Sequence, residues 1–291
     1  MCIGRGGLGM VNAQKQFCSF SISCIGFSHL KNGKPCQDHS CHFQDGERVI
    51  ITACDGHGGD LYIRSQIGSR FASEAICKVF GSIDQQTPIS PKKIRLEILC
   101  AWNTAVENDL SQNPIREEEL KALDERLRFQ LRKNPFLAYG TTLHGAMILG
   151  DQLCCASIGD GGIFAIRDNS VIPILQSEDE DTVANITHSM CEENAIQHLL
   201  VSITDFKEYD SILACTDGTL NPYHSMDNFS RSFALPIIRE AKAGNFQEIG
   251  RFMNQLGAKL GTGDDVSLAM IFRMEEKPEQ EKKPEDPEET K

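Results

Sequence analysis

Basic residues are scarce in this 291-residue sequence, which holds 29 Lys and Arg against 41 Asp and Glu for a formal net charge of −12. A protein that binds nucleic acid needs a basic face to replace the counterions of the phosphates. An anionic membrane surface attracts basic segments in the same way. We therefore expect neither nucleic acid nor a membrane as a partner, and the excess of acids needs another explanation.

The sequence also lacks long apolar runs and C-x-x-C cysteine pairs. No segment approaches the ~20 apolar residues of a membrane span, and the N-terminal sequence has no continuous apolar core of the kind found in secretory signals. We therefore expect a cytoplasmic protein whose 12 cysteines stay reduced. No C-x-x-C pair supports a structural zinc site, and no G-x-S-x-G motif indicates a serine hydrolase.

Part of the acid excess lies at the C-terminal end of the chain. Residues 275–291 contain eight acids, four lysines and three prolines but no apolar side chain. Such a segment buries too little surface to offset the entropy of ordering it, so we expect an acidic, disordered tail. We expect residues 1–274 to form one globular domain, and the protein to be a monomer. This body still carries 33 acids against 25 bases.

Short runs rich in Val, Ile, Leu, Cys and Phe, bounded by Gly, Asp or Asn, predict eight strands. The dipeptides Gly150-Asp151 and Asp168-Asn169 separate neighbouring runs at the spacing of hairpins, which indicates antiparallel sheets. The predicted strands are Phe17–Ser23, Arg48–Cys54, Thr142–Leu149, Gln152–Ile158, Gly162–Arg167, Val171–Leu175, Ser211–Cys215 and Val266–Phe272.

Longer amphipathic stretches predict helices between these strands. We expect an α+β fold in which helices cover antiparallel sheets. The pattern between Gln176 and Phe206 is ambiguous and reads as a polar loop before a short helix. The predicted helices are Leu61–Phe80, Lys92–Ser111, Arg116–Arg132 and Phe246–Leu260.

Acidic residues and glycines recur together where four of the predicted strands begin or end. A single Asp-Gly after a strand is more often a turn than a site, but four such corners favour a shared rim. Carboxylates gathered there would repel one another unless cations neutralise them, and hard oxygen ligands suit Mg²⁺ or Mn²⁺. The corners are Asp55-Gly56-His57-Gly58-Gly59, Gly159-Asp160-Gly161-Gly162, Thr216-Asp217-Gly218 and Gly261-Thr262-Gly263-Asp264-Asp265.

In their order along the chain these motifs resemble those of the metal-dependent protein phosphatases of the protein phosphatase 2C (PP2C) type. The resemblance implies a sandwich of two antiparallel sheets flanked by helices on both sides. It also implies hydrolysis of phosphoserine and phosphothreonine in proteins, opposed by a serine/threonine kinase, and Cys36-Gln37-Asp38 resembles a bacterial branch. The matching motifs are Gln37-Asp38, Asp55-Gly56-His57-Gly58-Gly59, Gly140-Thr141-Thr142, Gly159-Asp160, Thr216-Asp217-Gly218 and Gly263-Asp264-Asp265-Val266-Ser267.

The resemblance also implies a set of metal ligands. Asp55 would bridge two Mg²⁺ or Mn²⁺ ions, and the Gly56 carbonyl would bind one of them. Asp217 and Asp264 would complete the two sites, with Asp264 rather than Asp265 at the ligand position. Asp160 together with Asp217 could hold a weaker third ion. A water activated by the two ions would attack phosphorus without a nucleophilic side chain.

Two further residues take catalytic roles by the same resemblance. Asp38 would hold waters around the ions, and His57 would give a proton to the departing serine or threonine oxygen, for which an imidazole is suited near neutral pH. A solvated loop histidine is the simpler alternative for His57.

The sequence departs from the family pattern at the phosphate. Gly33 occupies the position of an arginine that holds the substrate phosphate in many relatives. Lys31 and Lys34 lie nearby and could bind phosphate instead, although lysine lacks the bidentate fork of arginine. A PP2C-like regulatory module with weak or no catalysis, which binds phosphoproteins, is therefore the alternative function. The other histidines (His144, His188, His198 and His224) match no metal-ligand spacing, and we expect packing or surface roles for them.

Overall fold

The computed structural model describes residues 17–46, 48–86, 88, 90–176 and 187–273. The predicted tail at 275–291 lies outside these residues, as do the first 16 residues and most of the polar loop that follows Gln176. The domain boundary at residue 274 therefore stays a prediction. In the part of the chain that is described, no helix combines the length and the apolar character needed to cross a membrane.

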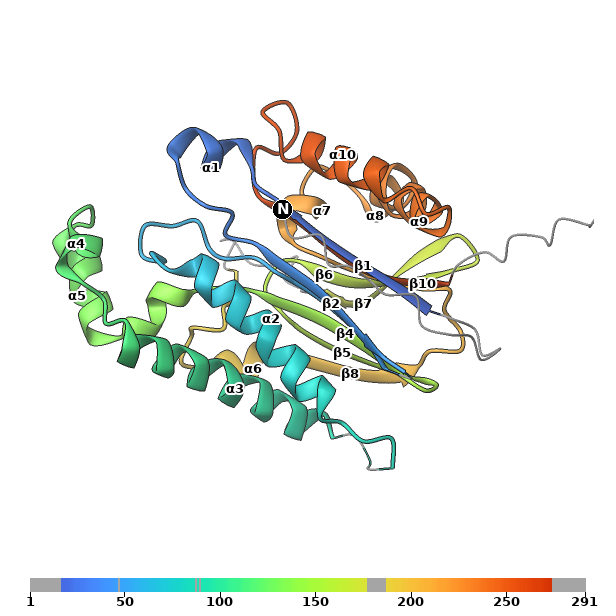
Figure 1. Cartoon of the computed structure of the whole chain (residues 1–291), viewed down its shortest axis with the longest axis horizontal. Helices are drawn as coiled ribbons and strands as arrows, with labels where there is room; N and C mark the ends of the chain where they lie inside the picture. The colour runs from blue at the N-terminus through green and yellow to red at the C-terminus, as the bar shows by residue number, and fades with distance from the viewer. Residues whose placement is uncertain (1–16, 47, 87, 89, 177–186, 274–291) are drawn as a thin grey trace, which may run out of the picture.

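Two antiparallel sheets of five strands form the centre of the molecule (Figure 1). The predicted sandwich fold is confirmed. The first sheet has the strand order β1 (Phe17–Cys24), β10 (Val266–Arg273), β9 (Ser211–Cys215), β6 (Gly162–Arg167) and β7 (Ser170–Gln176). The second has the order β2 (His39–Asp45), β3 (Arg48–Cys54), β4 (Leu143–Leu149), β5 (Gln152–Ile158) and β8 (Leu200–Asp205).

Helices cover the outer face of each sheet, so that the molecule has four layers (Figure 1). The second sheet packs against α2 (Ser65–Gly81), α3 (Pro91–Gln112), α5 (Glu125–Lys133), η1 (Pro135–Tyr139) and α6 (Ala195–His198). The first packs against α8 (Met226–Phe229), η2 (Ser230–Ala234), α9 (Leu235–Lys242) and α10 (Phe246–Leu256). Short helices complete the connections: α1 (Phe27–Asn32), α4 (Glu117–Leu120) and α7 (Asp217–Leu220).

Strand β3 shows why the strand sequences are apolar along their whole length. Successive side chains of a strand point to opposite faces. Ile50 and Cys54 pack against the helices, whereas Val49, Ile51 and Ala53 pack between the two sheets. Both faces of a central strand are therefore covered, and alternation with polar residues would leave unpaired polar groups in the core.

The two strands that sequence reasoning missed, β2 and β8, lie at edges of the second sheet. Their residues are half-buried or exposed, so polar side chains alternate with apolar ones and weaken the apolar signal. The predicted helix Arg116–Arg132 is also divided into α4 and α5. The division occurs because Asp124 caps α5, where its Oδ1 accepts a hydrogen bond of 2.8 Å from the Leu127 amide.

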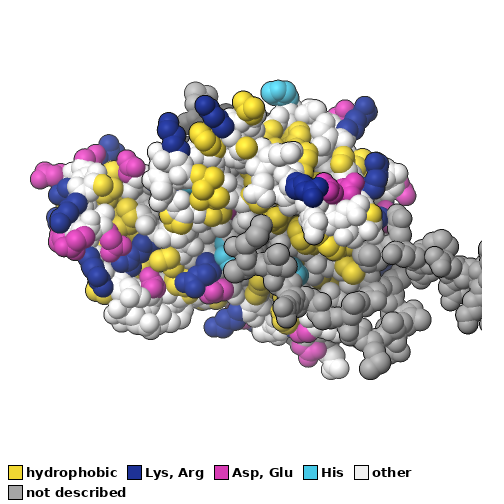
Figure 2. Space-filling view, turned by 45° about the horizontal axis from the view of Figure 1, so that its top comes forward, with side chains coloured by type: hydrophobic (Ala, Val, Ile, Leu, Met, Phe, Trp, Pro, Cys, Tyr) yellow, Lys and Arg dark blue, Asp and Glu magenta, His cyan; other side chains and the backbone are white. Residues whose placement is uncertain are grey.

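On the face of the molecule shown in Figure 2, Lys and Arg side chains alternate with Asp and Glu. The described residues on this face form no continuous basic surface.

The ends of the strands meet at one rim of the sandwich. In the second sheet Cys54 pairs with His39 and Leu143 pairs with Ile158, so β3 and β5 end where β2 and β4 begin. In the first sheet, β9 ends beside the first residues of β6 and β10. The loops that carry the four acid–glycine corners therefore leave the two sheets at the same end.

Arg64, at the start of α2, ties this rim to the helices of the second sheet. Its guanidinium donates to both carboxylate oxygens of Glu119 at 2.8 and 2.9 Å, to the Tyr139 hydroxyl at 2.7 Å and to the Asn113 carbonyl at 2.7 Å. The residue is 7% exposed. We expect Arg64→Ala to lower the free energy of unfolding by about 2–3 kcal/mol, because it leaves partly buried polar partners unpaired.

Urea unfolding of wild-type protein and variant measures this change. Arg132→Ala is the matched control, since Arg132 pairs with Glu117 at 3.1 Å on the exposed surface and its loss is expected to cost less than about 0.5 kcal/mol. Equal losses for the two variants would contradict the role given to the Arg64 network.

Candidate active site

Five aspartates project from the converging loops, and we call Asp38, Asp55, Asp160, Asp217 and Asp264 the acidic rim. Asp55, Asp160, Asp217 and Asp264 lie beside the ends of strands, as the sequence predicted, whereas Asp38 precedes β2, a strand that the sequence did not predict. Carboxylate oxygens of Asp55, Asp160 and Asp217 lie within 4.8 Å of one another. These three residues come from the ends of β3, β5 and β9, so both sheets contribute to the cluster.

The backbone of Asp55 is fixed by the Gly140-Thr141-Thr142 motif. The Asp55 carbonyl accepts hydrogen bonds from the Thr141 hydroxyl at 2.7 Å and from the Thr142 amide at 2.8 Å. The Asp55 amide donates to the Thr142 hydroxyl at 3.0 Å. The two threonines therefore satisfy the main chain of Asp55 and leave its carboxylate to face the rim.

Gly56 lies where two backbone segments approach it closely. A Cβ at this position would come within 2.5 Å of the Gln37 carbonyl oxygen and 2.7 Å of the Ser65 carbonyl oxygen, so a side chain has no room. The next residue, His57, donates its amide to the Gly140 carbonyl at 3.1 Å. Its ring packs edge-on against Tyr62 with 4.8 Å between centroids, which holds it beside the rim.

Asp38 approaches the rim from the start of β2 and is 7% exposed. Its Oδ2 accepts a hydrogen bond of 2.9 Å from the Thr216 hydroxyl, which links the second sheet to the first. Its Oδ1 is buried without a hydrogen-bond partner among the described residues. A buried carboxylate oxygen without a donor indicates that something else, such as a hydrated cation, belongs beside it.

Asp217 begins α7, and its two oxygens accept hydrogen bonds from the Gly218 amide at 2.6 Å and from the Asn221 side chain at 3.0 Å. Asp264 lies on the loop before β10 and is exposed. It is not one of the three residues within 4.8 Å, but its negative charge raises the pKa of Asp217. The two residues therefore belong to the same electrostatic group.

Sequence reasoning gave no role to Asp265, which is 3% exposed. Its carboxylate accepts hydrogen bonds from the Gly26 amide and the Gln37 amide, both at 2.6 Å, and contacts His29 Nδ1 at 2.8 Å. Asp265 therefore joins the loop after β1, the segment before Asp38 and the loop of Asp264. The acid–glycine pattern could not separate this structural aspartate from its neighbour.

The sequence analysis also missed Thr187 and Asn221. Thr187 contacts a residue far from it in the sequence, and Asn221 contacts a residue within the same short helical turn. The Thr187 hydroxyl donates to Asp160, as the Asn221 amide does to Asp217. Of the two lysines proposed for phosphate, Lys34 places its Nζ 3.5 Å from the Gly58 carbonyl oxygen. Lys31 is exposed on α1.

Burial and the negative charge of neighbouring carboxylates raise the pKa values of Asp38, Asp55, Asp217 and Asp264. Burial and the charge of Asp265 raise the pKa of Asp38 to about 7, although the contacts of its carboxylate with Asp55 and Thr216 oppose this shift. Burial and the charges of Asp38 and Asp217 raise the pKa of Asp55 well above its usual value. Burial and the charges of Asp160 and Asp264 raise the pKa of Asp217 to about 6. The protein thus holds carboxylates together that repel one another when ionised.

This donor set fits divalent cations of the Mg²⁺ and Mn²⁺ type. All of its side-chain ligand atoms are oxygens, and three of the carboxylates converge within the span of 4.8 Å. Bound cations would remove the repulsion that raises the pKa values, and they would face the Asp38 oxygen that has no donor.

A family model described as protein phosphatase 2C matches residues 25–254 of the chain. The match includes the motifs from Gln37 to Gly218 and ends before Asp264. No protein of curated function matches the chain by sequence at a significant level.

Solved structures of bacterial phosphatases share the fold at low sequence identity. A bacterial serine phosphatase matches with 17% identity and a TM-score of 0.60, over 90% of this chain and 100% of that chain. The Mycobacterium tuberculosis serine/threonine phosphatase PstP/Ppp matches with 14% identity and a TM-score of 0.57, over 89% of this chain and 99% of that chain. The catalytic domain of PstP in complex with two manganese ions matches with 14% identity and a TM-score of 0.54, over 89% and 99%.

The raised pKa values predict how the metal-free protein responds to pH. An aspartate whose folded-state pKa is raised destabilises the folded state as pH rises from its unfolded pKa to its folded pKa. Asp55→Asn removes one such group. In the presence of a chelator, we expect the unfolding free energy of the variant, minus that of wild type, to increase by about 1–3 kcal/mol when the pH is raised from about 5 to about 8.

Urea unfolding at the two pH values measures this gain. Asp227→Asn is the control, because Asp227 pairs with Arg231 on the exposed surface of α8 and has no part in the rim. The same difference between Asp55→Asn and wild type at both pH values would show that the rim carboxylates do not repel one another in the folded protein.

Proposed function

Because the chain belongs to the protein phosphatase 2C family, we propose that it hydrolyses phosphoserine and phosphothreonine in proteins with the help of Mg²⁺ or Mn²⁺ ions. The observation that carries this proposal is the convergence of Asp55, Asp160 and Asp217, with oxygens within 4.8 Å, at a rim that faces solvent through Asp160. The related PstP structure in complex with two manganese ions supports the choice of cation.

The proposed ligands are those of the family pattern, and the grouping of Asp55, Asp160 and Asp217 supports them. Asp55, the Gly56 carbonyl, Asp217 and Asp264 would hold two ions, and Asp160 with Asp217 would hold a weaker third one. Two divalent ions supply a water nucleophile near neutral pH and positive charge for the phosphoryl oxygens. The role of the protein would be to hold the ligand oxygens of these residues in place before the substrate binds.

His57 is the proton donor in this proposal. Burial lowers the pKa of His57, and the negative charges of Asp160 and Glu192 oppose that shift. These two carboxylates favour the protonated imidazole that a general acid requires. Edge-on packing against Tyr62 fixes the ring next to the rim, where the leaving oxygen of a serine or threonine would depart.

Lys34 is the better placed of the two lysines to meet the phosphate, since it contacts the loop that carries His57 at 3.5 Å through the Gly58 carbonyl. Lys31 would add only charge from the exposed face of α1. A phosphate-binding role requires that Lys34→Ala raise KM more than it changes kcat. An unchanged KM would show that a residue other than Lys34 binds the phosphate.

The proposed partners follow from the reaction. Phosphorylated proteins would be the substrates, and a serine/threonine kinase would supply them. The cytoplasmic location and the monomeric state predicted from the sequence stay predictions. The alternative of a PP2C-like module that binds phosphoproteins without turnover draws its support from Gly33, at the position where many relatives carry arginine.

Phosphate release from phosphoserine and phosphothreonine peptides in the presence of Mn²⁺ decides between the two functions. We expect turnover by wild-type protein, loss of turnover on chelation, and a fall of at least about 100-fold in kcat for Asp217→Asn, since an amide oxygen is a weaker ligand than a carboxylate. Arg231→Ala, on the exposed surface of α8 and η2, is the control and keeps full activity. Binding of the phosphopeptides without phosphate release by wild-type protein would favour the non-catalytic module.

The role of His57 predicts a dependence on the leaving group. We expect His57→Gln to lower kcat on a phosphoserine peptide by about 10²–10⁴-fold, because an alkoxide needs a proton as it leaves. The kcat of the same variant is expected to fall much less on p-nitrophenyl phosphate, because its phenolate can leave without receiving a proton. Equal losses on both substrates would show that His57 binds or positions rather than donates a proton.

A further inference from the structure

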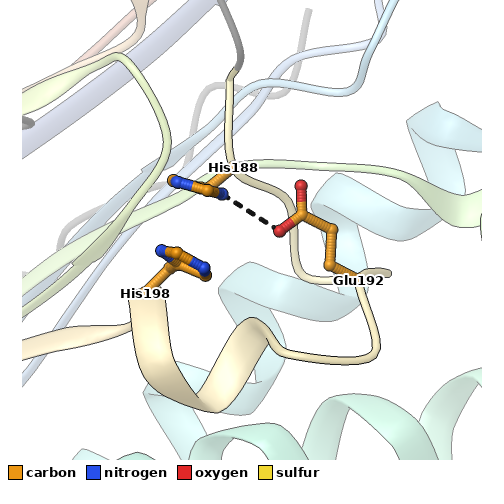
Figure 3. Close-up of side chains that lie close together, drawn as sticks. All are labelled: His188, Glu192 and His198. Carbon is orange, nitrogen blue, oxygen red and sulfur yellow. Dashed lines mark hydrogen bonds and ion pairs between the residues drawn. The ribbon is translucent and has the colours of Figure 1, made fainter. Parts of the chain in front are cut away.

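A second group of possible metal ligands lies beside the acidic rim, in the segment from Thr187 to His198. His188, Glu192 and His198 each place one ligand atom within 4.8 Å of the others. Figure 3 shows the two imidazole rings one above the other, with the Glu192 carboxylate beside His188. The ring centroids lie 3.4 Å apart at an interplanar angle of 16°, and Glu192 Oε2 lies 3.1 Å from His188 Nδ1.

The backbone of this segment is anchored, so the three side chains are brought together by the fold. The Thr141 amide donates to the Ser189 hydroxyl at 3.0 Å, and the Met190 amide donates to the Thr141 carbonyl at 2.9 Å. Further along, Met190, Cys191, Ala195 and Leu199 are buried in the core between the second sheet and its helices. His198 ends the single turn of α6, which places its ring under His188 (Figure 3).

We propose that His188, Glu192 and His198 bind one transition-metal ion of the Zn²⁺ class, at a site separate from the acidic rim. Two imidazoles and a carboxylate are the mixed nitrogen and oxygen donors that Zn²⁺ favours, whereas the all-oxygen rim suits Mg²⁺ and Mn²⁺. Three protein ligands leave the fourth position of a tetrahedral ion open to solvent.

The observed spacing is close to that of a bound ion. Ligand atoms around a tetrahedral Zn²⁺ lie about 3.3 Å apart, given metal–ligand distances of about 2.0–2.1 Å. The three atoms here lie within 4.8 Å of one another. The two stacked rings would have to turn about their side-chain bonds to bind one ion, because the nitrogen lone pairs lie in the ring planes and the planes are now nearly parallel at 16°. The side chains of His188 and Glu192 are 27% and 28% exposed, which leaves them open to an entering ion.

An i, i+4 ion pair between His188 and Glu192 is the simpler reading of two of these residues. It gives no reason for the third residue, His198, to stack on His188 within ligand distance of both partners. Asn194 further orients His198, with its Nδ2 atom 2.9 Å from Nε2 of the ring. The Asn194 amide is the donor in this contact, so an ion on Nδ1 of His198 would require the amide to turn and accept from Nε2–H through its Oδ1, which is the usual arrangement of a metal-binding histidine.

The proposed site is coupled to the acidic rim through its own backbone. Thr187, next to His188, donates to Asp160, and the negative charge of Glu192 acts on His57. An ion bound to His188 and His198 would fix this segment against the rim. The binding itself does not depend on the proposed phosphatase function, so the two can be tested apart.

Co²⁺ titration of the full-length protein, followed by visible absorption, tests the proposal. The Asp55→Asn variant is used as the background because it weakens the rim without touching the proposed site. We expect one Co²⁺ ion bound per chain with the intense visible bands of a four-coordinate ion, displaced by Zn²⁺. His188→Ala or His198→Ala, made in that background, is expected to weaken binding by at least about 100-fold.

Two further variants keep the test informative if a histidine replacement disturbs the fold. His224→Ala, an exposed histidine outside the cluster, is the matched control and should bind as the background does. His198→Cys replaces one zinc ligand by another, so it should retain the ion and add a thiolate-to-cobalt charge-transfer band. A purely structural role for His198 would give no such band.

Three results would overturn the proposal. The first is the absence of four-coordinate Co²⁺ in the Asp55→Asn background. The second is equal affinity in the His188→Ala and background proteins. The third is a thiolate charge-transfer band before any cysteine is introduced, which would place the ion on native cysteines instead.

Discussion

The mutual repulsion of carboxylates at one rim of the sandwich is the constraint on which this structure depends. Asp38, Asp55 and Asp217 are held close together in a partly buried setting, and burial with neighbouring charge raises the pKa of each. A folded protein that keeps ionisable groups in this arrangement gives up stability unless cations bind there. The rim therefore makes physical sense as a site for divalent cations.

The surrounding residues hold the rim against that repulsion. Thr141 and Thr142 fix the main chain of Asp55, and Thr216 reaches across from the first sheet to Asp38. Asp265, which is buried, joins three loops by accepting hydrogen bonds from two amides and contacting His29. Because these contacts span both sheets, the site forms only when the sandwich is packed.

Much of this arrangement could be predicted from the chain alone. Buried strands such as β3 are apolar along their length and end at an acid–glycine corner, so the local sequence predicts both the strand and the position of Asp55. Edge strands such as β2 carry mixed polar and apolar side chains, so the local sequence does not predict them. The separate tasks of Asp264 and Asp265 depend on which carboxylate faces the Gly26 and Gln37 amides, and that is decided by packing between distant loops. The grouping of His188 with His198 was missed for the same reason, since their sequence spacing matches no metal motif.

Crystals of the protein soaked in Mn²⁺ and measured at the manganese absorption edge test the central claim most directly. We expect anomalous difference peaks between Asp55, Asp217 and Asp264, within coordination distance of their oxygens and of the Gly56 carbonyl. A rim that shows no anomalous peak at millimolar Mn²⁺, with the carboxylates in the same positions, would contradict it.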